Sequence, residues 1–347
     1  MEDANRASAD RGQVILVTGG AGFVGSAVVR RLVGSGHRVR ALIRSTSDSR
    51  NLRCLPIDTI TGDLTDRHSL KQALRGCDVL FHVAADYRLW VPEPKRMYEN
   101  NVRGTEKIME EALKAGVRKI IYTSSVATLR LSGNGAPADE TSAASLKHMI
   151  GHYKRSKFMA EAAVLRLIET RGLPAVVVNP STPVGPGDIK PTPTGRFIAD
   201  AVAGRMPAYV NTGLNIVHVD DVARGHLLAL EHGRIGERYI LGGHNMTLKE
   251  ILMEIAAIAG CTPPRVCIPH KLILSVALLS EVWARCASGR EPRVSLDGAR
   301  MARKQMFFSS EKAEQELAYT PRPAREALTD AVHWFLQNGY GNKQRKP

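Results

Sequence analysis

The segment from Val14 to Gly25 constrains the fold of this chain more than any other. It begins with the apolar, largely β-branched run Val14-Ile15-Leu16-Val17 and continues as Thr18-Gly19-Gly20-Ala21-Gly22-Phe23-Val24-Gly25. Such a run is typical of a buried parallel strand, and the apolar spacing from Gly25 to Ser35 is typical of a helix. The glycines allow a tight turn, and the helix N-terminus presents N–H groups to a pyrophosphate. The segment predicts a dinucleotide-binding unit, although an ordinary glycine-rich turn is the alternative.

Strand and helix patterns alternate after this segment. Further strands are expected at 38–43, 79–83, 119–123 and 175–179, and helices near 69–74, 98–115 and 154–169. Alternation of this kind predicts an α/β fold, namely a Rossmann-type, doubly wound parallel sheet with helices on both faces.

The last third of the chain predicts a smaller C-terminal lobe. Five prolines interrupt residues 179–195, which are expected to form an ordered loop. A strand at 239–241 and helices near 248–259, 272–284 and 324–338 follow. We predict a disordered tail at 1–12, mainly the NAD(P)-binding domain at 13–180, mainly a substrate-binding lobe with some returning sheet elements at 181–340, and a basic tail at 341–347.

The apolar stretch from Leu272 to Ala284 is too short to span a bilayer. We expect a helix packed on the protein's own core, and a position in a membrane interface stays open as the alternative. The basic segment from Arg285 to Lys304 follows and could lie near anionic lipid.

Charge and cysteine content limit the kinds of function that this chain could have. The chain has 48 Lys and Arg against 34 Asp and Glu, a formal net charge of +14. This charge favours anionic partners, but no nucleic-acid motif accompanies it, so a basic surface that attracts a phosphorylated cofactor is preferred to nucleic acid. The five cysteines lack CxxC spacing, which argues against a disulfide framework and a metal site, and the N-terminus has no apolar signal core. A cytoplasmic location is expected.

The end of the second strand bears on cofactor choice. An acidic residue there binds a free ribose 2′-hydroxyl, whereas an arginine accommodates a 2′-phosphate. The strand ends at Arg44, and the next acid is Asp48. The sequence therefore favours NADP(H), with NAD(H) as the alternative and a solvated surface charge as the other interpretation of Arg44.

Tyr153 and Lys157 form the most informative pair of the chain. Their spacing of four places both on one face of a helix. A nearby ammonium stabilises a phenolate, so we expect the pKa of Tyr153 to be lowered from about 10. Ser125, at the end of the strand 119–123, could hydrogen-bond the substrate oxygen. The three residues predict proton transfer coupled to hydride transfer.

These residues together resemble the extended short-chain dehydrogenase/reductase family, over nearly the whole chain from Val14 to about Tyr340. The resemblance implies a catalytic triad of Ser125, Tyr153 and Lys157, with Ser124 as the second choice for the serine. The cofactor-binding positions that it implies, together with those from the motifs above, are Gly19, Gly22, Phe23, Val24, Gly25, Arg44, Asp63, Leu64, Val83, Ala84, Ala85, Asn101, Thr123, Tyr153, Lys157, Pro180, Ser181 and Thr182.

Two subgroups of the family compete. The segments 84–90, 150–157 and 179–195 resemble the bacterial hopanoid-associated sugar epimerases, which are in turn similar to dihydroflavonol 4-reductases. An epimerase would use tightly held NAD to remove and return a hydride, whereas a reductase would use dissociable NADPH. The sequence leaves both open. A non-catalytic, dinucleotide-binding regulatory protein is the third alternative.

The substrate is expected to be a small molecule, either a sugar or a hopanoid- or polyketide-like carbonyl compound. Its pocket would lie between the sheet edge and the second lobe. The candidate contacts are Tyr87, Arg88, Trp90, Ser125, Lys190 and Arg196. For the proline loop, simple packing of the two lobes is the alternative. The resemblance also suggests a homodimer that pairs the helices near 99–115 and 154–169, and peripheral membrane contact is left open.

Overall fold

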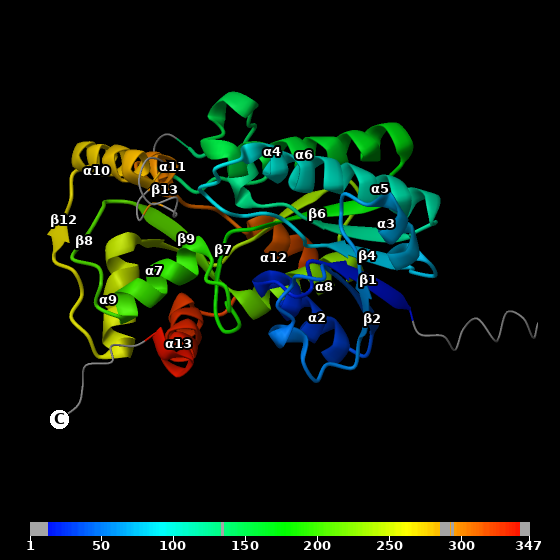
Figure 1. Cartoon of the computed structure of the whole chain (residues 1–347), viewed down its shortest axis with the longest axis horizontal. Helices are drawn as coiled ribbons and strands as arrows, with labels where there is room; N and C mark the ends of the chain where they lie inside the picture. The colour runs from blue at the N-terminus through cyan, green and yellow to red at the C-terminus, as the bar shows by residue number, and fades with distance from the viewer. Residues whose placement is uncertain (1–12, 133–134, 285–291, 293–294, 341–347) are drawn as a thin grey trace, which may run out of the picture.

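A seven-stranded parallel sheet organises the larger part of the molecule (Figure 1). The computed structural model describes residues 13–132, 135–284, 292 and 295–340, so the predicted tails at 1–12 and 341–347 lie outside it. The strands are β1 (Val14–Thr18), β2 (Arg38–Ile43), β3 (Asp58–Thr61), β4 (Val79–His82), β5 (Lys119–Thr123), β6 (Ala175–Pro180) and β10 (Arg238–Leu241). Their order is β10-β6-β5-β4-β1-β2-β3, and each neighbouring pair is parallel. The predicted fold class is confirmed.

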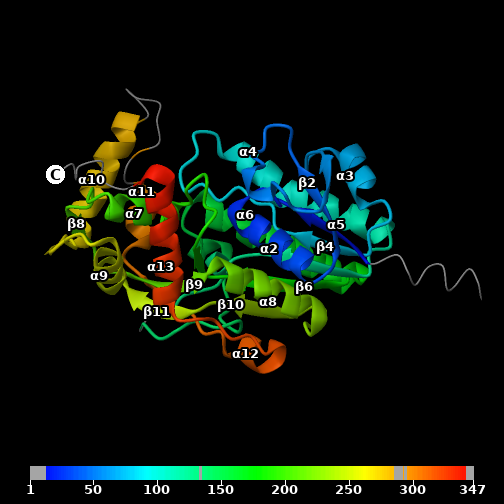
Figure 2. The ribbon, with the colours of Figure 1, turned by 90° about the horizontal axis from the view of Figure 1, so that it is seen from below.

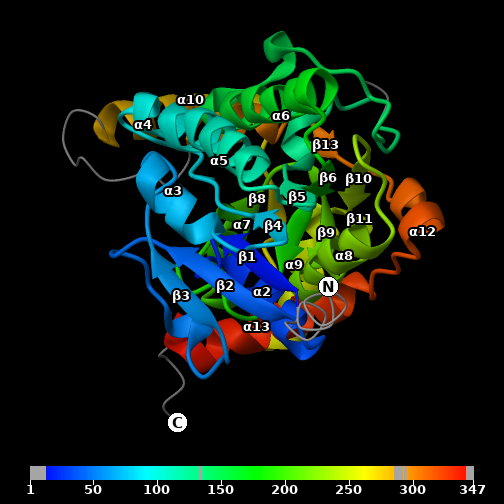
Figure 3. The ribbon, with the colours of Figure 1, turned by 90° about the vertical axis from the view of Figure 1, so that its right-hand side faces the viewer.

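Alternating side chains of the strands supply two hydrophobic layers. In β1, Ile15 and Val17 pack with α2 (Phe23–Gly34) and α8 (Val219–Glu231). Leu16 points to the opposite face, where α3 (Arg67–Leu74), α5 (Gly104–Lys114) and α6 (Gly151–Arg171) cover the sheet. Figure 3 shows the sheet between these two helical layers. Because both faces are covered, the central strands are apolar throughout rather than alternating with polar residues.

A second, smaller group of elements lies at one end of the sheet (Figure 2). Its strands are β7 (Thr182–Val184), β9 (Gly213–His218), β11 (His244–Thr247) and β13 (Gln305–Met306), and each of the other three pairs with β9. Its helices α7 (Pro193–Val202), α9 (Leu248–Ala259) and α13 (Ala324–Phe335) share a separate hydrophobic core. The short pair β8 (Ala208–Tyr209) and β12 (Val266–Cys267) lies beyond them. Strand β10 returns from this half of the sequence to the edge of the main sheet, and α12 (Glu311–Leu317) packs with α8.

The prediction of an uninterrupted loop at 179–195 is wrong at both ends. Pro183 lies in β7, which pairs with β9, and Pro193 is the first residue of α7. Proline is well tolerated at the first helical position because the N–H that it lacks has no partner there. Thr192 then caps the helix by accepting from the Gly195 amide at 3.0 Å.

The helix expected at 98–115 begins earlier and changes its winding. It consists of α4 (Pro94–Tyr98), a π-helical turn at Glu99–Arg103, and α5. No apolar run predicts the bounds of β3, because its residues are mostly exposed. The π-helical turn contains Asn101, a predicted cofactor-binding residue.

The helix α10 (His270–Trp283) contradicts the expected packing on the core. Of its fourteen residues only Ala277 is buried, and the large apolar side chains of the helix are mostly exposed. Its main neighbour is the short helix α11 (Leu296–Met301), which cannot cover it. Within the described residues, no helix has the length and apolar character needed to cross a membrane.

Candidate functional site

The glycine segment forms a turn into which no larger residue fits. Gly19 has a φ of +69°, and a Cβ there would lie 2.7 Å from the backbone of Ala84 on the neighbouring strand's extension. A Cβ on Gly25 would lie 2.1 Å from the carbonyl oxygen of Gly19. The Gly22 amide donates to the same carbonyl at 2.9 Å and closes the turn.

The first turn of α2 is free to receive an anion. Gly22 occupies the N-cap position without a side-chain hydrogen bond, and no acidic residue lies in the first turn. The amides of Phe23, Val24 and Gly25 therefore present N–H groups and the positive end of the helix dipole without a competing side chain. This cradle stands at the C-terminal end of β1, between β4 and β2, where a doubly wound sheet binds its ligand. The residues present fit a dinucleotide pyrophosphate.

Arg44 lies at the neighbouring strand end, exposed to solvent, immediately after β2. Burial raises the pKa of Asp63, but hydrogen bonds from Thr65 at 2.7 and 2.8 Å outweigh it, and the nearby Arg44 also acts to lower that pKa. The pKa of Asp86 is shifted by similar effects. Burial raises this pKa, while Arg88 and, more weakly, Arg44 hold it below its usual range. The structure thus gathers Arg44, Asp63 and Asp86 along one edge of the sheet.

The segment after β4 is fixed against both the first strand and the π-helical turn. Thr18 accepts the amides of Val83 and Ala84, each at 3.3 Å, through its carbonyl and its hydroxyl respectively. Asn101 accepts the Asp86 amide at 2.7 Å and donates to its carbonyl at 2.8 Å. The same amide group of Asn101 lies 3.0 Å from the Ser156 hydroxyl, which links this edge to α6.

The pair Tyr153 and Lys157 lies on the inner face of α6, as the spacing predicts. A hydrogen bond joins the Tyr153 phenol to Ser125, which caps a short 3₁₀ turn at Val126–Thr128. Burial nevertheless raises the pKa of Tyr153, and the hydrogen bond from Ser125 offsets only part of the rise. This direction is opposite to the expected lowering. In the structure the ammonium of Lys157 is directed elsewhere.

Lys157 is buried and is held at the end of β5. Its Nζ donates to the carbonyl of Thr123 at 2.8 Å and lies 5.0 Å from the centre of the Tyr122 ring. Burial lowers the pKa of Lys157 to about 8, against the opposing effect of Glu161. A cation in this position is available to a hydroxyl-bearing ligand above the strand ends.

A network of buried polar residues, which the sequence analysis did not locate, surrounds this pair. Glu161 accepts from Asn179 at 2.9 Å, from Thr128 at 3.0 Å and from Arg238 at 3.3 Å. Glu161 follows Lys157 by four residues, so helical spacing could have placed it on the same face. Asn179 and Arg238 come from distant strands, and no sequence signal connects them.

Two buried histidines complete the polar network. His82 lies 2.7 Å from the Thr18 hydroxyl and 3.0 Å from the Thr105 hydroxyl, and His226 lies 2.8 Å from the Thr123 hydroxyl. Burial lowers the pKa of His82 to about 3, with a further contribution from Lys157, and burial lowers that of His226 to about 4. Both rings are therefore neutral at neutral pH and act as hydrogen-bonding spacers beneath the strand ends.

The proline loop approaches the segment after β4. The Tyr87 hydroxyl donates to the Lys190 carbonyl at 3.4 Å, and the charge of Arg196 acts on Tyr87. Asp188 lies beneath the loop and accepts from Thr192, and its burial raises its pKa to about 6. The structure thus brings the predicted residues Tyr87, Lys190 and Arg196 together.

The remaining predicted contacts lie partly after β4 and partly where the main sheet meets the second one. Arg88 forms an ion pair with Asp86, and Trp90 is half-buried in the same segment. Pro180 ends β6, Thr182 begins β7, and Ser181 between them donates to the Asn215 carbonyl at 3.0 Å. The residues from 180 to 182 therefore join the main sheet to the second one. Leu64 packs against Gly104 at the far edge, and Ala85 is half-buried beside Ala84.

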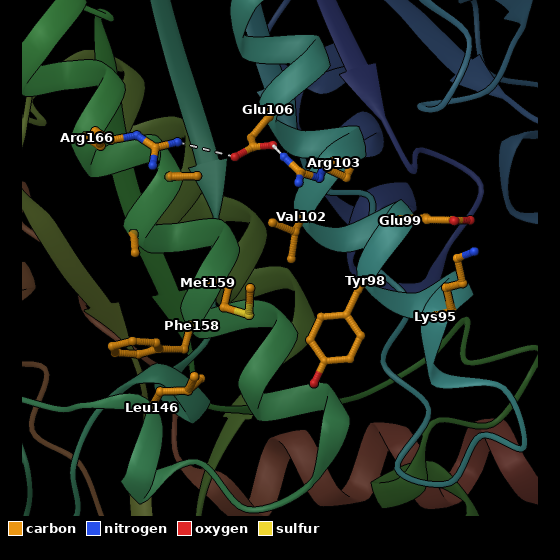
Figure 4. Close-up of a pocket in the computed structure, with 12 residues that line it drawn as sticks. Lys95, Tyr98, Glu99, Val102, Arg103, Glu106, Leu146, Phe158, Met159 and Arg166 are labelled. Carbon is orange, nitrogen blue, oxygen red and sulfur yellow. Dashed lines mark hydrogen bonds and ion pairs between the residues drawn. The ribbon is translucent and has the colours of Figure 1, made fainter.

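The outer face of α6 carries a hollow that is separate from this site (Figure 4). Met159, Phe158 and Leu146 line one side of it, and Tyr98 and Val102 line the other. Glu106 on α5 accepts from Arg103 at 2.9 Å and from Arg166 at 3.3 Å across the hollow. None of the predicted triad residues lines it, so α6 presents different chemistry on its two faces.

The profile of the NAD dependent epimerase/dehydratase family matches residues 15–242. A protein from Synechocystis sp. named putative dihydroflavonol 4-reductase is 46% identical over 94% of this chain and 96% of its own length. Sterol demethylase protein B from Methylococcus capsulatus is 35% identical over 93% of this chain and 98% of its own length.

Solved structures of similar proteins have the same fold as this chain. The crystal structure of gox2253 has a TM-score of 0.86 and 57% sequence identity, and the match covers 95% of this chain and all of that one. A nucleoside-diphosphate-sugar epimerase from Pseudomonas aeruginosa has a TM-score of 0.79 and 27% identity, over 95% and 99% of the two chains.

The chain belongs to the NAD-dependent epimerase/dehydratase family, within the extended short-chain dehydrogenase/reductases. It is an enzyme of the oxidoreductase and epimerase class, and the cofactor of its family is a nicotinamide dinucleotide. The family resemblance drawn from the sequence is confirmed, and the regulatory, non-catalytic alternative is set aside.

Proposed function

We propose that this enzyme is an NADP(H)-dependent reductase that acts on a ketone or aldehyde group of an apolar small molecule. The proposal rests mainly on Arg44, which is exposed at the end of β2 where no acidic residue stands and therefore suits the 2′-phosphate of a dissociable NADPH. The Tyr153 phenol is protonated at neutral pH, because burial raises its pKa above the ordinary value. A protonated phenol is the form that donates to a carbonyl oxygen as it becomes an alcohol.

A bound nicotinamide dinucleotide would supply the hydride. Ser125 and Tyr153 hold the carbonyl oxygen of the substrate between their hydroxyls, and Tyr153 donates its proton to that oxygen. Lys157, on the same face of α6 and held by the Thr123 carbonyl, places a positive charge beneath the site. The hydrogen bond from Asn101 to Ser156 fixes the edge of the sheet against α6. It thereby helps to hold the Ser125 and Tyr153 hydroxyls in position.

The cofactor assignment rests on two places in the structure, the start of α2 and the end of β2. The uncapped start of α2, with Gly19, Gly22 and Gly25, suits the pyrophosphate. Arg44, exposed at the end of β2 where no acidic residue stands, suits a 2′-phosphate. Asp63, Leu64, Val83, Ala84 and Ala85 would line the adenosine half, and Pro180, Ser181 and Thr182 would line the nicotinamide half.

The substrate would lie between the strand ends of the 13–180 region and the 181–340 region, which we assign as the substrate-binding lobe. Tyr87 and Trp90 offer aromatic walls, while Arg88, Lys190 and Arg196 offer polar contacts at the rim. The names of two relatives, a dihydroflavonol reductase and a sterol demethylase protein, refer to apolar ring systems and favour this substrate class. Free thiols and the dinucleotide cofactor favour the cytoplasm.

A sugar epimerase is the second candidate, favoured by the resemblance of the segments 84–90, 150–157 and 179–195 to the hopanoid-associated group. In that reaction the alcohol carbon would lose and regain a hydride, and Tyr153 would accept and return the proton. The same residues serve both reactions, so the fate of the cofactor separates them.

The deciding experiment identifies the nucleotide retained by the purified protein and titrates NADPH and NADH. We expect an empty site that prefers NADPH and consumes it in the presence of bulky ketones. Tightly retained NAD without any net consumption of reduced cofactor would overturn the reductase and support the epimerase.

We also propose a homodimer through the outer faces of α5 and α6. Leu146 and Met159 are about 40% exposed beside the hollow of Figure 4 and would be covered by the partner. Sedimentation should give a dimer that Met159→Arg dissociates. A monomeric wild-type protein would rule out this arrangement.

A further inference from the structure

The helix α10 carries a continuous apolar surface that nothing in the described chain covers. Leu272, Val276, Leu279 and Trp283 follow a spacing of four, three and four, which places them in one stripe. Leu278 and Val282 form a second stripe beside it. All six are between 51% and 71% exposed. Single exposed apolar residues are common on protein surfaces, but a whole helical face of them marks a binding surface.

The charge of the surrounding segment indicates what would cover this face. From Arg265 to Lys304 the sequence holds eight Arg and Lys residues against three Asp and Glu residues. Among those that the structure describes, Lys271 is exposed on α10, and Arg303 and Lys304 are exposed just after α11. An apolar helical face with tryptophan and flanking basic residues is the pattern of a helix that lies in the headgroup layer of an anionic membrane. A second copy of the same face would bring like charges together.

The position of α10 suits this role. Figure 2 shows α10 at the outer edge of the molecule, at the end that also holds α7 and α9. The backbone amide of Leu296, at the start of α11, donates to Glu281 in the last turn of α10 at 2.7 Å. The two helices are thereby fixed to each other.

The pair α10 and α11 also adjoins the catalytic helix. Asp297 on α11 contacts Gly151, since a Cβ on Gly151 would lie 2.7 Å from the Asp297 carboxylate. Gly151 is the first residue of α6 and precedes Tyr153 by two positions. A membrane that receives α10 would therefore lie close to the entrance of the site.

We propose that α10 docks this enzyme on the headgroup layer of an anionic bilayer through Leu272, Val276, Leu278, Leu279, Val282 and Trp283. The docked enzyme then takes its apolar substrate from the lipid phase. This substrate class rests on the proposed reductase function. The docking itself does not depend on that function.

The experiment uses the full chain and vesicles of phosphatidylserine and phosphatidylcholine in equal parts, with co-sedimentation at low salt. The test variant is Leu279→Glu with Trp283→Glu, and the control is Ile235→Glu with Met253→Glu. The control adds the same charge at residues of similar exposure, 56% and 53%, on other elements. Circular dichroism and urea unfolding of each variant verify the fold.

We expect the wild-type protein to bind these vesicles and the test variant to lose binding by about tenfold or more, while the control keeps it within about twofold. Binding should weaken on pure phosphatidylcholine and at high salt. Trp283 fluorescence should shift to the blue on vesicles, and this shift should be missing in Trp283→Phe.

The proposal is overturned if the wild-type protein ignores the vesicles, if both double variants lose binding equally, or if pure phosphatidylcholine is bound as well as the anionic mixture. It is also overturned if the wild-type protein self-associates without lipid and the test variant alone prevents this, because a second copy then covers α10. Failure of carbonyl reduction in every variant would refute the proposed function and leave the docking result standing.

Discussion

The helices α6 and α10 are opposite in composition and opposite in burial. The sequence of α6, from Gly151 to Arg171, is rich in charged residues, yet it buries Lys157 and Glu161 at the centre of the candidate site. The sequence of α10 is largely apolar, yet most of its large side chains face solvent. The neighbours of a helix, and not its composition, therefore decide its burial. Apolar residues of α6 pack with those of the sheet strands and α5, whereas α10 has mainly α11.

The largest expected effect falls on the inner face of α6. Tyr153→Phe should lower kcat by about 10³-fold or more, because the proton donor is lost, and should leave NADPH affinity nearly unchanged. Steady-state kinetics with a reducible ketone and a fluorescence titration of NADPH measure the two quantities. Tyr98→Phe, the same change on the outer side, is the control and should retain activity. Substantial turnover by Tyr153→Phe would remove Tyr153 from the chemistry.

Acid should destabilise the buried polar network around α6. The pKa values of His82 and His226, about 3 and about 4, lie below the unfolded value of 6.5. Their contribution to stability is therefore complete above pH 6.5 and is lost as the pH falls toward these folded values. At pH 5 the two groups together should have cost about 4 kcal/mol of unfolding free energy, at about 1.4 kcal/mol per pH unit for each.

Urea unfolding at pH 7.5 and pH 5 measures this loss. His82→Gln should reduce the dependence on pH by about half, whatever its effect on stability at pH 7.5. An unfolding free energy that is the same at both pH values would show that the two histidines are not held neutral by burial.

The same substitution on the two helices should give different stabilities. Leu167 on α6 is 8% exposed, whereas Leu279 on α10 is 71% exposed. Leu167→Ala should lower the unfolding free energy by about 2–4 kcal/mol, because it leaves a cavity in the core. Leu279→Ala should change it by less than about 0.5 kcal/mol. Chemical denaturation of the two variants compares them, and equal losses would mean that α10 is covered in solution.

The smallest expected effect concerns the cofactor edge. Arg44→Asp should shift the ratio of NADPH to NADH affinity by about tenfold or more toward NADH, because a 2′-phosphate would meet a carboxylate in place of a guanidinium. Arg53→Asp makes the same change of charge at an exposed position on a nearby turn and should leave the ratio unchanged. An unaltered ratio in Arg44→Asp would show that another group reads the 2′ position.

Local patterns were enough to predict several features of this protein. The apolar run at 14–17 followed by glycines predicted β1 and the start of α2, and the spacing of Tyr153 and Lys157 predicted their common helical face. These features depend on local backbone preferences and on residue spacing within a single element, and both can be inferred from the sequence. The alternation of apolar runs likewise predicted the doubly wound sheet.

Tertiary structure decided what contacts each element. The network of Glu161, Asn179 and Arg238 joins one helix to two strands, and no periodicity links residues so far apart. The pKa of Tyr153 rises where the pair of residues alone suggested a fall, because the phenol is buried and the Lys157 ammonium donates to a backbone carbonyl instead. The apolar face of α10 is exposed because no element of the described chain lies opposite it. Sequence alone determined the central strands of the main sheet and the helices between them, whereas burial and charge state depend on neighbours that only the folded chain brings together.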